Sequence, residues 1–207
     1  MQLRNISRMI VIALVVVVGA VALIHQRLST DASTPTATAT VTLTGGTPLG
    51  NTPIPTMSLK DQFGAVVTNQ SLAGHPTVVT FMDMTCTQEC PIQAQLLNQT
   101  AIFMGAQKAA QVNWVVVSVN PKNTPADANS FMAKNKVTIP VKVLLGSQAQ
   151  LQPVWKGYYI TVKPTPTDVI HSDSLFLIDK SGQERMIFIG GFDPKALSQD
   201  LTVLLAQ

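Results

Sequence analysis

One stretch of seven residues constrains this chain more than any other, because it holds both of the chain's cysteines. The stretch Thr85–Pro91 follows the apolar run Pro76–Met82 and precedes a helical pattern that begins at Ile92. This order predicts a strand, a tight loop that carries both thiols, and a helix. Pro91 is expected at the first helical position, where its missing N–H costs nothing, and Cys90 at the N-cap. Unpaired backbone N–H groups and the helix dipole would favour a thiolate there.

Two sulfurs four positions apart allow three kinds of chemistry. Cys86 and Cys90 can form a redox pair, share a soft metal ion, or act as a nucleophile and a resolving thiol. In an exported protein, a small structural disulfide explains the pair equally well. The spacing alone does not decide between these alternatives.

The N-terminal sequence predicts the cellular compartment in which the cysteines lie. Arg4 and Arg8 precede an uncharged apolar run, Met9–Ile24. At about 1.5 Å per residue this run spans about 24 Å, somewhat less than a hydrocarbon core of about 30 Å. It is therefore a signal peptide or a short uncleaved signal anchor, and we favour an anchor over residues 1–28 with its arginines in the cytosol. The rest of the chain would then lie outside the cytoplasm, held at the cell membrane by a single pass.

Residues 29–55 are predicted to be a flexible linker. They are rich in Thr, Ala, Pro and Gly, carry almost no charge, and show neither a helical nor a strand period. Residues 56–207 are long enough for one domain with a substantial core. Charged residues are 12% of the chain, and much of the net charge of +3 comes from arginines beside the apolar run. No basic stripe indicates a nucleic-acid partner.

Strand and helix patterns alternate through residues 56–207. The predicted elements are a hairpin at Met57–Val67, a strand at Thr77–Met82, a helix at Ile92–Gln111, a buried strand at Val112–Val119, a helix at Pro125–Lys136 with Thr124 as its N-cap, a strand at Val141–Leu145, a helix at Gln148–Tyr159, a loop at Thr161–Val169, a hairpin at Ser174–Ile189 and a helix at Pro194–Ala206. This is the order of a thioredoxin-like α/β domain, in which helices flank a central mixed sheet. A right-handed crossover would place the thiols at the carboxyl edge of that sheet.

His171 is expected on the same side of the sheet as the cysteine loop, within the loop Asp168–Asp173. A lone loop histidine is by default a solvated surface residue. Beside a dithiol, however, Cys86, Cys90 and His171 make a set of two sulfurs and one nitrogen, which suits copper better than magnesium, calcium or manganese. A structural zinc site would normally need a fourth ligand.

These residues resemble the Sco/SenC family of membrane-anchored, thioredoxin-fold copper proteins, which help to assemble the dinuclear copper centre of cytochrome c oxidase. The resemblance covers roughly Met57 to Ala206. Three motifs carry it: Cys-x-x-x-Cys-Pro after a core strand (Cys86–Pro91), Val-Ser-Val-Asp-Pro ahead of Thr-Pro (here Val117–Pro121 and Thr124–Pro125), and His-Ser ahead of Leu-Ile-Asp-x-x-Gly (His171–Ser172 and Leu177–Gly182).

The resemblance implies a copper metallochaperone. Cys86 and Cys90 thiolates and a His171 nitrogen would bind one copper ion, as Cu(I) or Cu(II), and pass it by ligand exchange to the copper-centre subunit of cytochrome c oxidase or to another copper protein. Cys86 and Cys90 would also be a redox-active dithiol, because their disulfide has no thiolate to offer a metal.

The alternative is an enzyme, a membrane-tethered thiol-disulfide oxidoreductase. The Cys-x-x-x-Cys spacing differs from the Cys-x-x-Cys of ordinary thioredoxins, so we rank this alternative below the copper metallochaperone. A peroxiredoxin is expected still less, because Asp83 stands where that family has a Thr.

Several positions depart from the Sco/SenC pattern. Met82-Asp83-Met84 replace aromatic and Gly residues, Thr87 replaces a Pro, Asn120 stands where Asp is usual, and Ile170 replaces an acidic residue. All three expected ligands are intact, so these changes concern redox tuning, partner recognition and the groups that orient His171. The sulfurs of Met82 and Met84 could contact Cu(I), but we expect these side chains to serve in packing.

Overall fold

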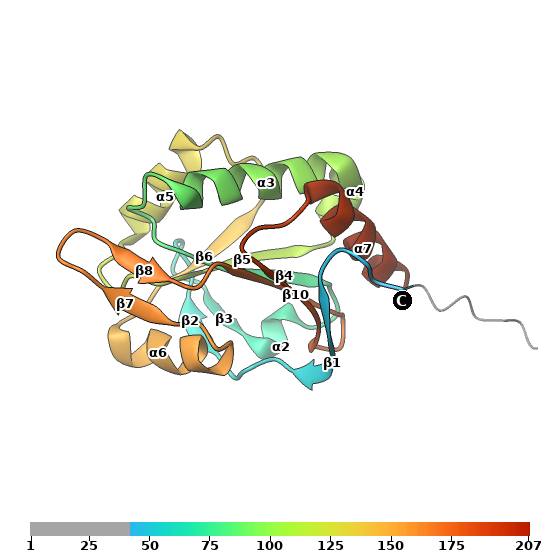
Figure 1. The fold of residues 1–207 in the computed structure, drawn as a ribbon, viewed down its shortest axis with the longest axis horizontal. Helices are drawn as coiled ribbons and strands as arrows, with labels where there is room; N and C mark the ends of the chain where they lie inside the picture. Colours follow the sequence, from blue (N-terminus) through green and yellow to red (C-terminus); the bar gives the residue numbers. More distant parts are fainter. Residues whose placement is uncertain (1–41) are drawn as a thin grey trace, which may run out of the picture. The chain divides into compact units, whose positions relative to one another are not determined.

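A central six-stranded sheet organises the computed structural model, which describes residues 42–207 (Figure 1). The strand order is β1-β10-β9-β4-β5-β6. The strands are β1 (Thr47–Pro53), β4 (Thr77–Met82), β5 (Asn113–Ser118), β6 (Val141–Leu144), β9 (Ser174–Ile178) and β10 (Gln183–Ile189). β4, β5 and β6 are parallel, whereas β9, β10 and β1 continue the sheet in antiparallel pairs. The predicted mixed sheet is therefore confirmed.

Two short antiparallel pairs lie outside this sheet. The first joins β2 (Ser58–Lys60) to β3 (Val66–Thr68), as the hairpin pattern predicts. The second joins β7 (Val162–Pro164) to β8 (Val169–His171). This second hairpin corrects the prediction of a plain loop at residues 161–169. Its strands are short and mostly exposed, so they have no alternation of buried and exposed residues that a sequence pattern could reveal.

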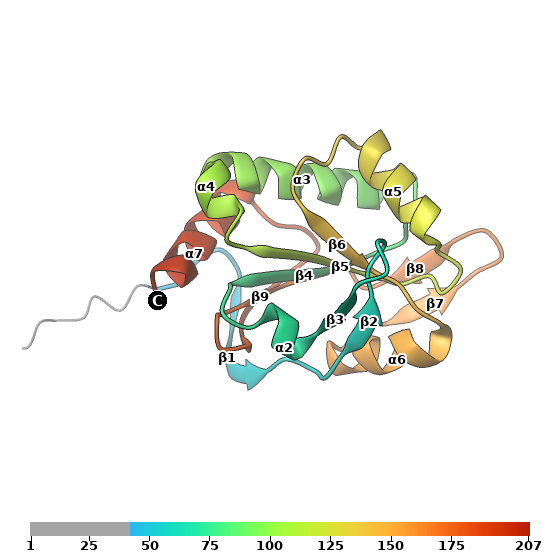
Figure 2. The same cartoon turned by 180° about the vertical axis from the view of Figure 1, so that it is seen from behind.

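Helices cover both faces of the sheet (Figures 1 and 2). One face carries α3 (Glu89–Met104), α4 (Ala106–Ala109), α5 (Pro125–Lys134) and α7 (Pro194–Ala206), and the other carries α2 (Asn69–Leu72) and α6 (Gln148–Gly157). The core accordingly has two layers. Val78 of β4 packs in the layer under α3 and α7, and its neighbour Val79 packs in the layer under α6. Because successive strand side chains point to opposite faces, a strand that serves both layers is continuously apolar.

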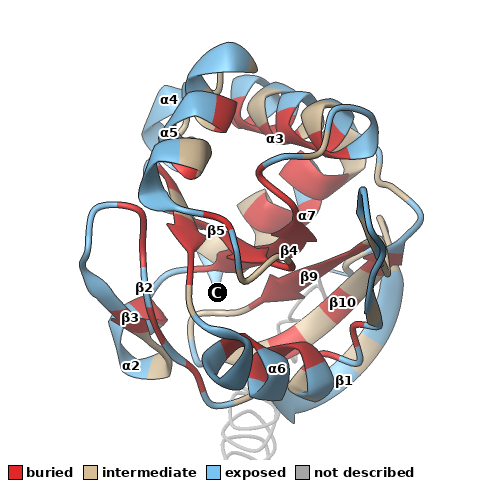
Figure 3. Cartoon of the chain, turned by 90° about the vertical axis from the view of Figure 1, so that its left-hand side faces the viewer, coloured by how far each residue is buried: buried red, intermediate tan, exposed pale blue. Residues whose placement is uncertain are grey.

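Figure 3 shows that this burial is concentrated in the middle of the sheet, along β4, β5 and β9. All residues of β4 and β9 are buried. The carboxyl end of β4 is therefore held in the core, away from solvent. The loop that carries the cysteines leaves the sheet at this end.

Local signals explain where several helices begin and end. The Thr124 side chain accepts a hydrogen bond from the Asp127 N–H, and the Asp127 carboxylate accepts one from the Thr124 N–H. With Pro125 in the first turn, this capping box confirms the predicted start of α5. The predicted helix Ile92–Gln111 is interrupted at Gly105, whose φ of 77° is disallowed in a right-handed helix.

The end of the predicted linker belongs to the folded domain. Residues Thr47–Pro53 form β1, which pairs with β10 at the edge of the sheet. The buried Asp200 carboxylate accepts hydrogen bonds from the N–H groups of Thr44 and Gly45, both at 2.9 Å. β1 escapes a pattern search because it is an exposed edge strand with a register shift, so it has no apolar alternation.

The predicted membrane anchor, residues 1–28, and the first part of the predicted linker lie outside the described residues. Within residues 42–207, none of the helices is long and apolar enough to cross a membrane.

Candidate metal centre

The cysteine loop connects the end of β4 to the start of α3. The Cys86 N–H donates to the Asp83 carbonyl oxygen at 3.1 Å, which closes a turn directly after the strand. Helix α3 begins at Glu89, with Gln88 at the N-cap. Cys90 is thus the second helical residue and Pro91 the third, which corrects the predicted N-cap at Cys90. Proline is tolerated there because none of the N–H groups of the first turn has an intrahelical partner.

The two thiols differ in their exposure to solvent. Cys90 is 2% exposed and packs in the core, whereas Cys86 is partly exposed, and both are free cysteines. Burial raises the pKa of the Cys90 thiol far above its usual value, the nearby Cys86 adds to this rise, and a hydrogen bond from the Asp83 backbone opposes it. The prediction of a thiolate at Cys90 is therefore wrong for the metal-free protein. Loss of hydration outweighs the helix dipole at this position.

The Asp83 carboxylate ties the cysteine loop to the loop that follows β5. Its Oδ1 accepts from the Thr85 N–H at 2.9 Å, the Thr85 hydroxyl at 2.8 Å and Asn123 Nδ2 at 2.9 Å. Its Oδ2 accepts from Asn120 Nδ2 at 3.0 Å. Asp83 is buried, and among residues 42–207 it has no ion-pair partner. These four hydrogen bonds replace the water that the charge has lost.

His171 approaches the same region from strand β8. It pairs with Val162 of β7, so it is part of the short hairpin and not of an irregular loop. Its Nδ1 lies 2.9 Å from the carbonyl oxygen of Ser172. Because a carbonyl oxygen can only accept a hydrogen bond, Nδ1 carries the proton, and in the neutral imidazole the lone pair of Nε2 is available.

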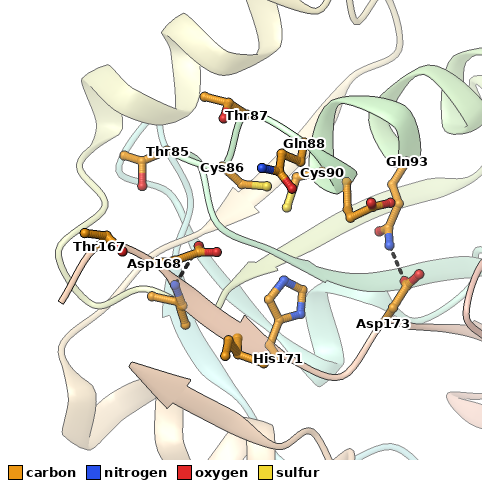
Figure 4. Close-up of a pocket in the computed structure, with 13 residues that line it drawn as sticks. Thr85, Cys86, Thr87, Gln88, Cys90, Gln93, Thr167, Asp168, His171 and Asp173 are labelled. Atoms are coloured by element: carbon orange, nitrogen blue, oxygen red, sulfur yellow. Dashed lines mark hydrogen bonds between the residues drawn. The ribbon is translucent and has the colours of Figure 1, made fainter. Parts of the chain in front are cut away.

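Both cysteines and His171 line one pocket of about 470 Å³. Figure 4 shows the two sulfurs on one wall and the imidazole directed toward them from the opposite wall. The structure therefore places the three site residues that the sequence predicts around one pocket.

Gln93 and Asp173, which the sequence analysis did not single out, also line this pocket. Gln93 Nε2 donates a hydrogen bond to Asp173 Oδ1, joining α3 to the segment that follows His171 (Figure 4). Burial raises the pKa of Asp173, while the hydrogen bond from Gln93 and the neighbouring His171 act in the opposite direction. The one signal in the sequence is the position of Gln93, one helical turn after Cys90.

The donor atoms fit copper in kind. Two thiols and one imidazole are soft or intermediate ligands of the type that copper prefers. Within residues 42–207, however, no three His, Cys, Asp or Glu side chains lie close enough together to hold a metal ion as they stand. Met82 and Met84 are buried in the core and do not line this pocket, as their predicted packing role requires.

Comparison with known proteins identifies relatives over most of the described part. The model of the family SCO1/SenC matches residues 50–206. The copper-bound ScoI of Bradyrhizobium japonicum is 28% identical with a TM-score of 0.64, over 74% of this chain and 99% of that chain. No curated protein sequence matches this chain.

Two further solved structures show the same fold at lower identity. A SCO1/SenC family lipoprotein of Bacillus anthracis is 24% identical with a TM-score of 0.66, over 76% of this chain and 97% of its own. BsSco, a member of the Sco family of cytochrome c oxidase assembly proteins with a disulfide switch, is 21% identical with a TM-score of 0.65, over 75% and 94%.

Proposed function

The chain belongs to the SCO1/SenC family, and from this premise we propose that it is a membrane-tethered metallochaperone that delivers copper to the copper centre of cytochrome c oxidase. The observation that carries the proposal is the single pocket shared by Cys86, Cys90 and His171. The similar ScoI of Bradyrhizobium japonicum binds copper, and BsSco belongs to the cytochrome c oxidase assembly proteins. The tether is the predicted anchor, which would hold the domain on the outer side of the cell membrane.

The Cys86 and Cys90 thiolates and His171 Nε2 would hold the copper ion. Binding releases the protons of both thiols, because a metal binds the thiolate form. The positive charge of the ion then replaces the thiol proton at the buried Cys90, so the charge on that sulfur is compensated. The Nδ1 hydrogen bond to Ser172 leaves Nε2 as the donor nitrogen and fixes the orientation of the ring.

The difference in exposure predicts the order in which a partner would take the copper ion. His171 and Cys86 are partly exposed, whereas Cys90 is buried. Thiolate or imidazole ligands of the partner would therefore replace His171 and Cys86 first, and Cys90 would be the last ligand to leave. A stepwise exchange of this kind never releases a free copper ion.

A second function is favoured by the same pair of thiols. Cys86 and Cys90 lie close enough for Cys86 to raise the pKa of Cys90, and one thiol is accessible and the other buried, as in a dithiol reductant. The Cys86 thiolate would attack a partner's disulfide and form a mixed disulfide, releasing one partner thiolate. Cys90 would then attack the Cys86 sulfur and release the second, so two electrons and two protons pass to the partner. The resulting Cys86–Cys90 disulfide could not bind copper.

Replacing His171 separates the two functions. In the full-length, fully reduced chain, His171→Ala is expected to lower Cu(I) affinity by at least about two orders of magnitude, since loss of a ligand should exceed the effect of losing a group that orients one. Affinity is measured by competition with a chromogenic Cu(I) chelator. The rate at which the chain reduces oxidised glutathione should largely persist, because the dithiol is intact.

His75→Ala is the matched control. His75 is exposed, and its Nδ1 also lies against a backbone carbonyl, that of Gln111 at 3.0 Å, but it does not line the pocket. It should change neither measurement. If His171→Ala binds copper as tightly as the control, the proposed metal function fails, and the chain is better explained as a dithiol reductase.

A further inference from the structure

A groove lies beside the pocket that Cys86, Cys90 and His171 line, which we call the metal pocket, and Asp173 lines both of them. We call it the β10 groove. Its volume is about 540 Å³, and it is formed by β1, by the residues that follow α6, by β9 and by β10. Its apolar walls include Leu49, Phe176, Ile187 and Ile189. Anything seated in the β10 groove would therefore lie next to the segment that positions His171.

Tyr159 lines this groove in a conformation that the chain itself does not favour. It follows α6 with a φ of 56°, the left-handed region where glycine is the usual residue. A non-glycine residue is disfavoured there, because its Cβ crowds the backbone. The Tyr159 side chain is 90% exposed, so its ring gains no burial in return. An aromatic ring that is costly to hold and does not pack within residues 42–207 indicates a contact outside this chain.

One of the residues that line the groove has a buried polar group without a partner among the described residues. Tyr158 is 1% exposed, with its ring packed against those of Phe81 and Phe176, yet within residues 42–207 its hydroxyl has no hydrogen-bond partner. Glu184 also lines the groove, and its side chain has neither a hydrogen bond nor an ion pair in the described part of the chain, but its carboxylate oxygens remain in contact with solvent. Burial raises the pKa of Tyr158, and the neighbouring Glu184 adds to that effect. A buried hydroxyl such as that of Tyr158 normally has a partner.

The groove also has an unbalanced charge. Glu184 and Asp173 are its two ionisable carboxylates, and no Lys, Arg or His residue lines it. Ile189 at its rim is 73% exposed. A ligand that complements this lining would bring a cation between apolar groups. An arginine fits best, because its planar guanidinium can donate to a carboxylate and stack on an aromatic ring at the same time.

We propose that the β10 groove docks an extended polypeptide segment of the copper-receiving partner, with an arginine directed at Glu184 and Tyr159 and apolar neighbours against Ile187 and Ile189. The proposal rests on the proposed function, because that function supplies the partner. Docking at this place would bring the partner's ligands to the metal pocket across Asp173.

The test uses two fluorescent pentapeptides, Leu-Val-Arg-Val-Leu and the same peptide with citrulline in place of arginine, which keeps the shape and removes the charge. Binding to the full-length reduced chain is followed by anisotropy. The arginine peptide should bind about tenfold more tightly than the citrulline peptide. Glu184→Gln should abolish this preference.

Tyr159→Gly gives a readout that loss of folding cannot imitate. It should weaken binding of the arginine peptide several-fold while raising the temperature of thermal unfolding, because glycine relieves the positive φ. Phe63→Gly is the control, since Phe63 is another highly exposed aromatic side chain that does not line the groove, and it should leave peptide binding unchanged.

Equal affinity for the two peptides, or an arginine preference that survives Glu184→Gln, would overturn the proposal. Binding of free Nα-acetylarginine amide as tight as that of the peptide would also overturn it, because the groove would then be a site for small cations. Cu(I) affinity is measured separately and should be unchanged in both groove variants. A wild-type chain that binds no copper would refute the proposed function without altering the peptide result.

Discussion

Replacing Asp83 by asparagine should destabilise the cysteine loop, and replacing Asn120 by aspartate in the same chain should restore it. In the native protein Asp83 accepts four hydrogen bonds, three at Oδ1 and one at Oδ2. In Asp83→Asn the amide nitrogen takes the place of one oxygen. If it replaces Oδ2, it faces Asn120 Nδ2, so two donors oppose each other.

Rotating the Asn120 amide does not solve the problem. Asn120 Oδ1 already accepts from the Lys122 N–H at 3.0 Å, so rotation only moves the clash of donors to that group. One donor is left without an acceptor in either arrangement, and the remaining hydrogen bonds lose their charge-assisted character. We expect a loss of about 2–4 kcal/mol in the free energy of unfolding.

The double variant Asp83→Asn with Asn120→Asp should recover most of this loss. The new amide at position 83 can donate to the new carboxylate at position 120, whose second oxygen still accepts from the Lys122 N–H. Asn120→Asp alone should also destabilise the protein, because two carboxylates would then meet at the contact that is now 3.0 Å long. The double-mutant cycle should give a coupling energy of about 2–3 kcal/mol.

Urea unfolding of the reduced, copper-free, full-length chain measures this cycle. Asp61→Asn is the matched control, because Asp61 is also a buried carboxylate but accepts only at Oδ1, within the β2–β3 turn. Additive losses in the double variant, within about 0.5 kcal/mol, would refute the reasoning.

Three further outcomes are expected. Asp200→Asn should cost about 1–3 kcal/mol in urea unfolding, because one amide oxygen cannot accept from both the Thr44 and the Gly45 N–H; a change below about 0.5 kcal/mol would contradict the role of Asp200. Thr124→Ala should cost about 1 kcal/mol through loss of the cap, and an unchanged unfolding midpoint would count against the capping box. Burial raises the pKa of Glu184 in the folded state. Protonated Glu184 therefore contributes stability below the unfolded-state pKa of about 4.3, and this contribution is lost as the pH rises through the folded-state pKa. Glu184→Gln should therefore be more stable than the native chain at pH 7, with the difference vanishing below about pH 4; a constant difference across this range would be inconsistent with that assignment.

Local patterns predict the centre of this fold well. The apolar run Trp114–Val117 is continuous because β5 contributes side chains to both core layers. Thr124 and Pro125 mark the start of α5 because a capping side chain and a fixed φ act within one turn. Signals of this kind need no knowledge of the rest of the chain.

Elements that depend on distant partners escape such patterns. β1 exists because β10, more than a hundred residues later, offers it an edge, and nothing within Thr47–Pro53 encodes that partner. The predicted ionisation of Cys90 is wrong for a similar reason. Its position in the first turn of α3 favours a thiolate, but burial in the core raises its pKa instead.

In the candidate site, too, some features can be predicted from local sequence and others depend on distant partners. Cys86, Cys90 and His171 are identifiable from the sequence because few other residue types bind soft metals. The sequence shows Asp83 and Asn120 only as separate departures from the family pattern. The structure shows that they are one pair, joined by a 3.0 Å hydrogen bond. Because the two residues are 37 positions apart in the chain, only the fold reveals their connection.

X-ray absorption spectroscopy of the reduced, full-length chain loaded with one equivalent of Cu(I) tests the central claim most directly. The account predicts a coordination shell of two sulfurs and one nitrogen, from Cys86, Cys90 and His171. In His171→Ala the nitrogen contribution should disappear, whereas His75→Ala should leave the spectrum unchanged. A native shell without nitrogen, or a nitrogen that remains in His171→Ala, would contradict the account.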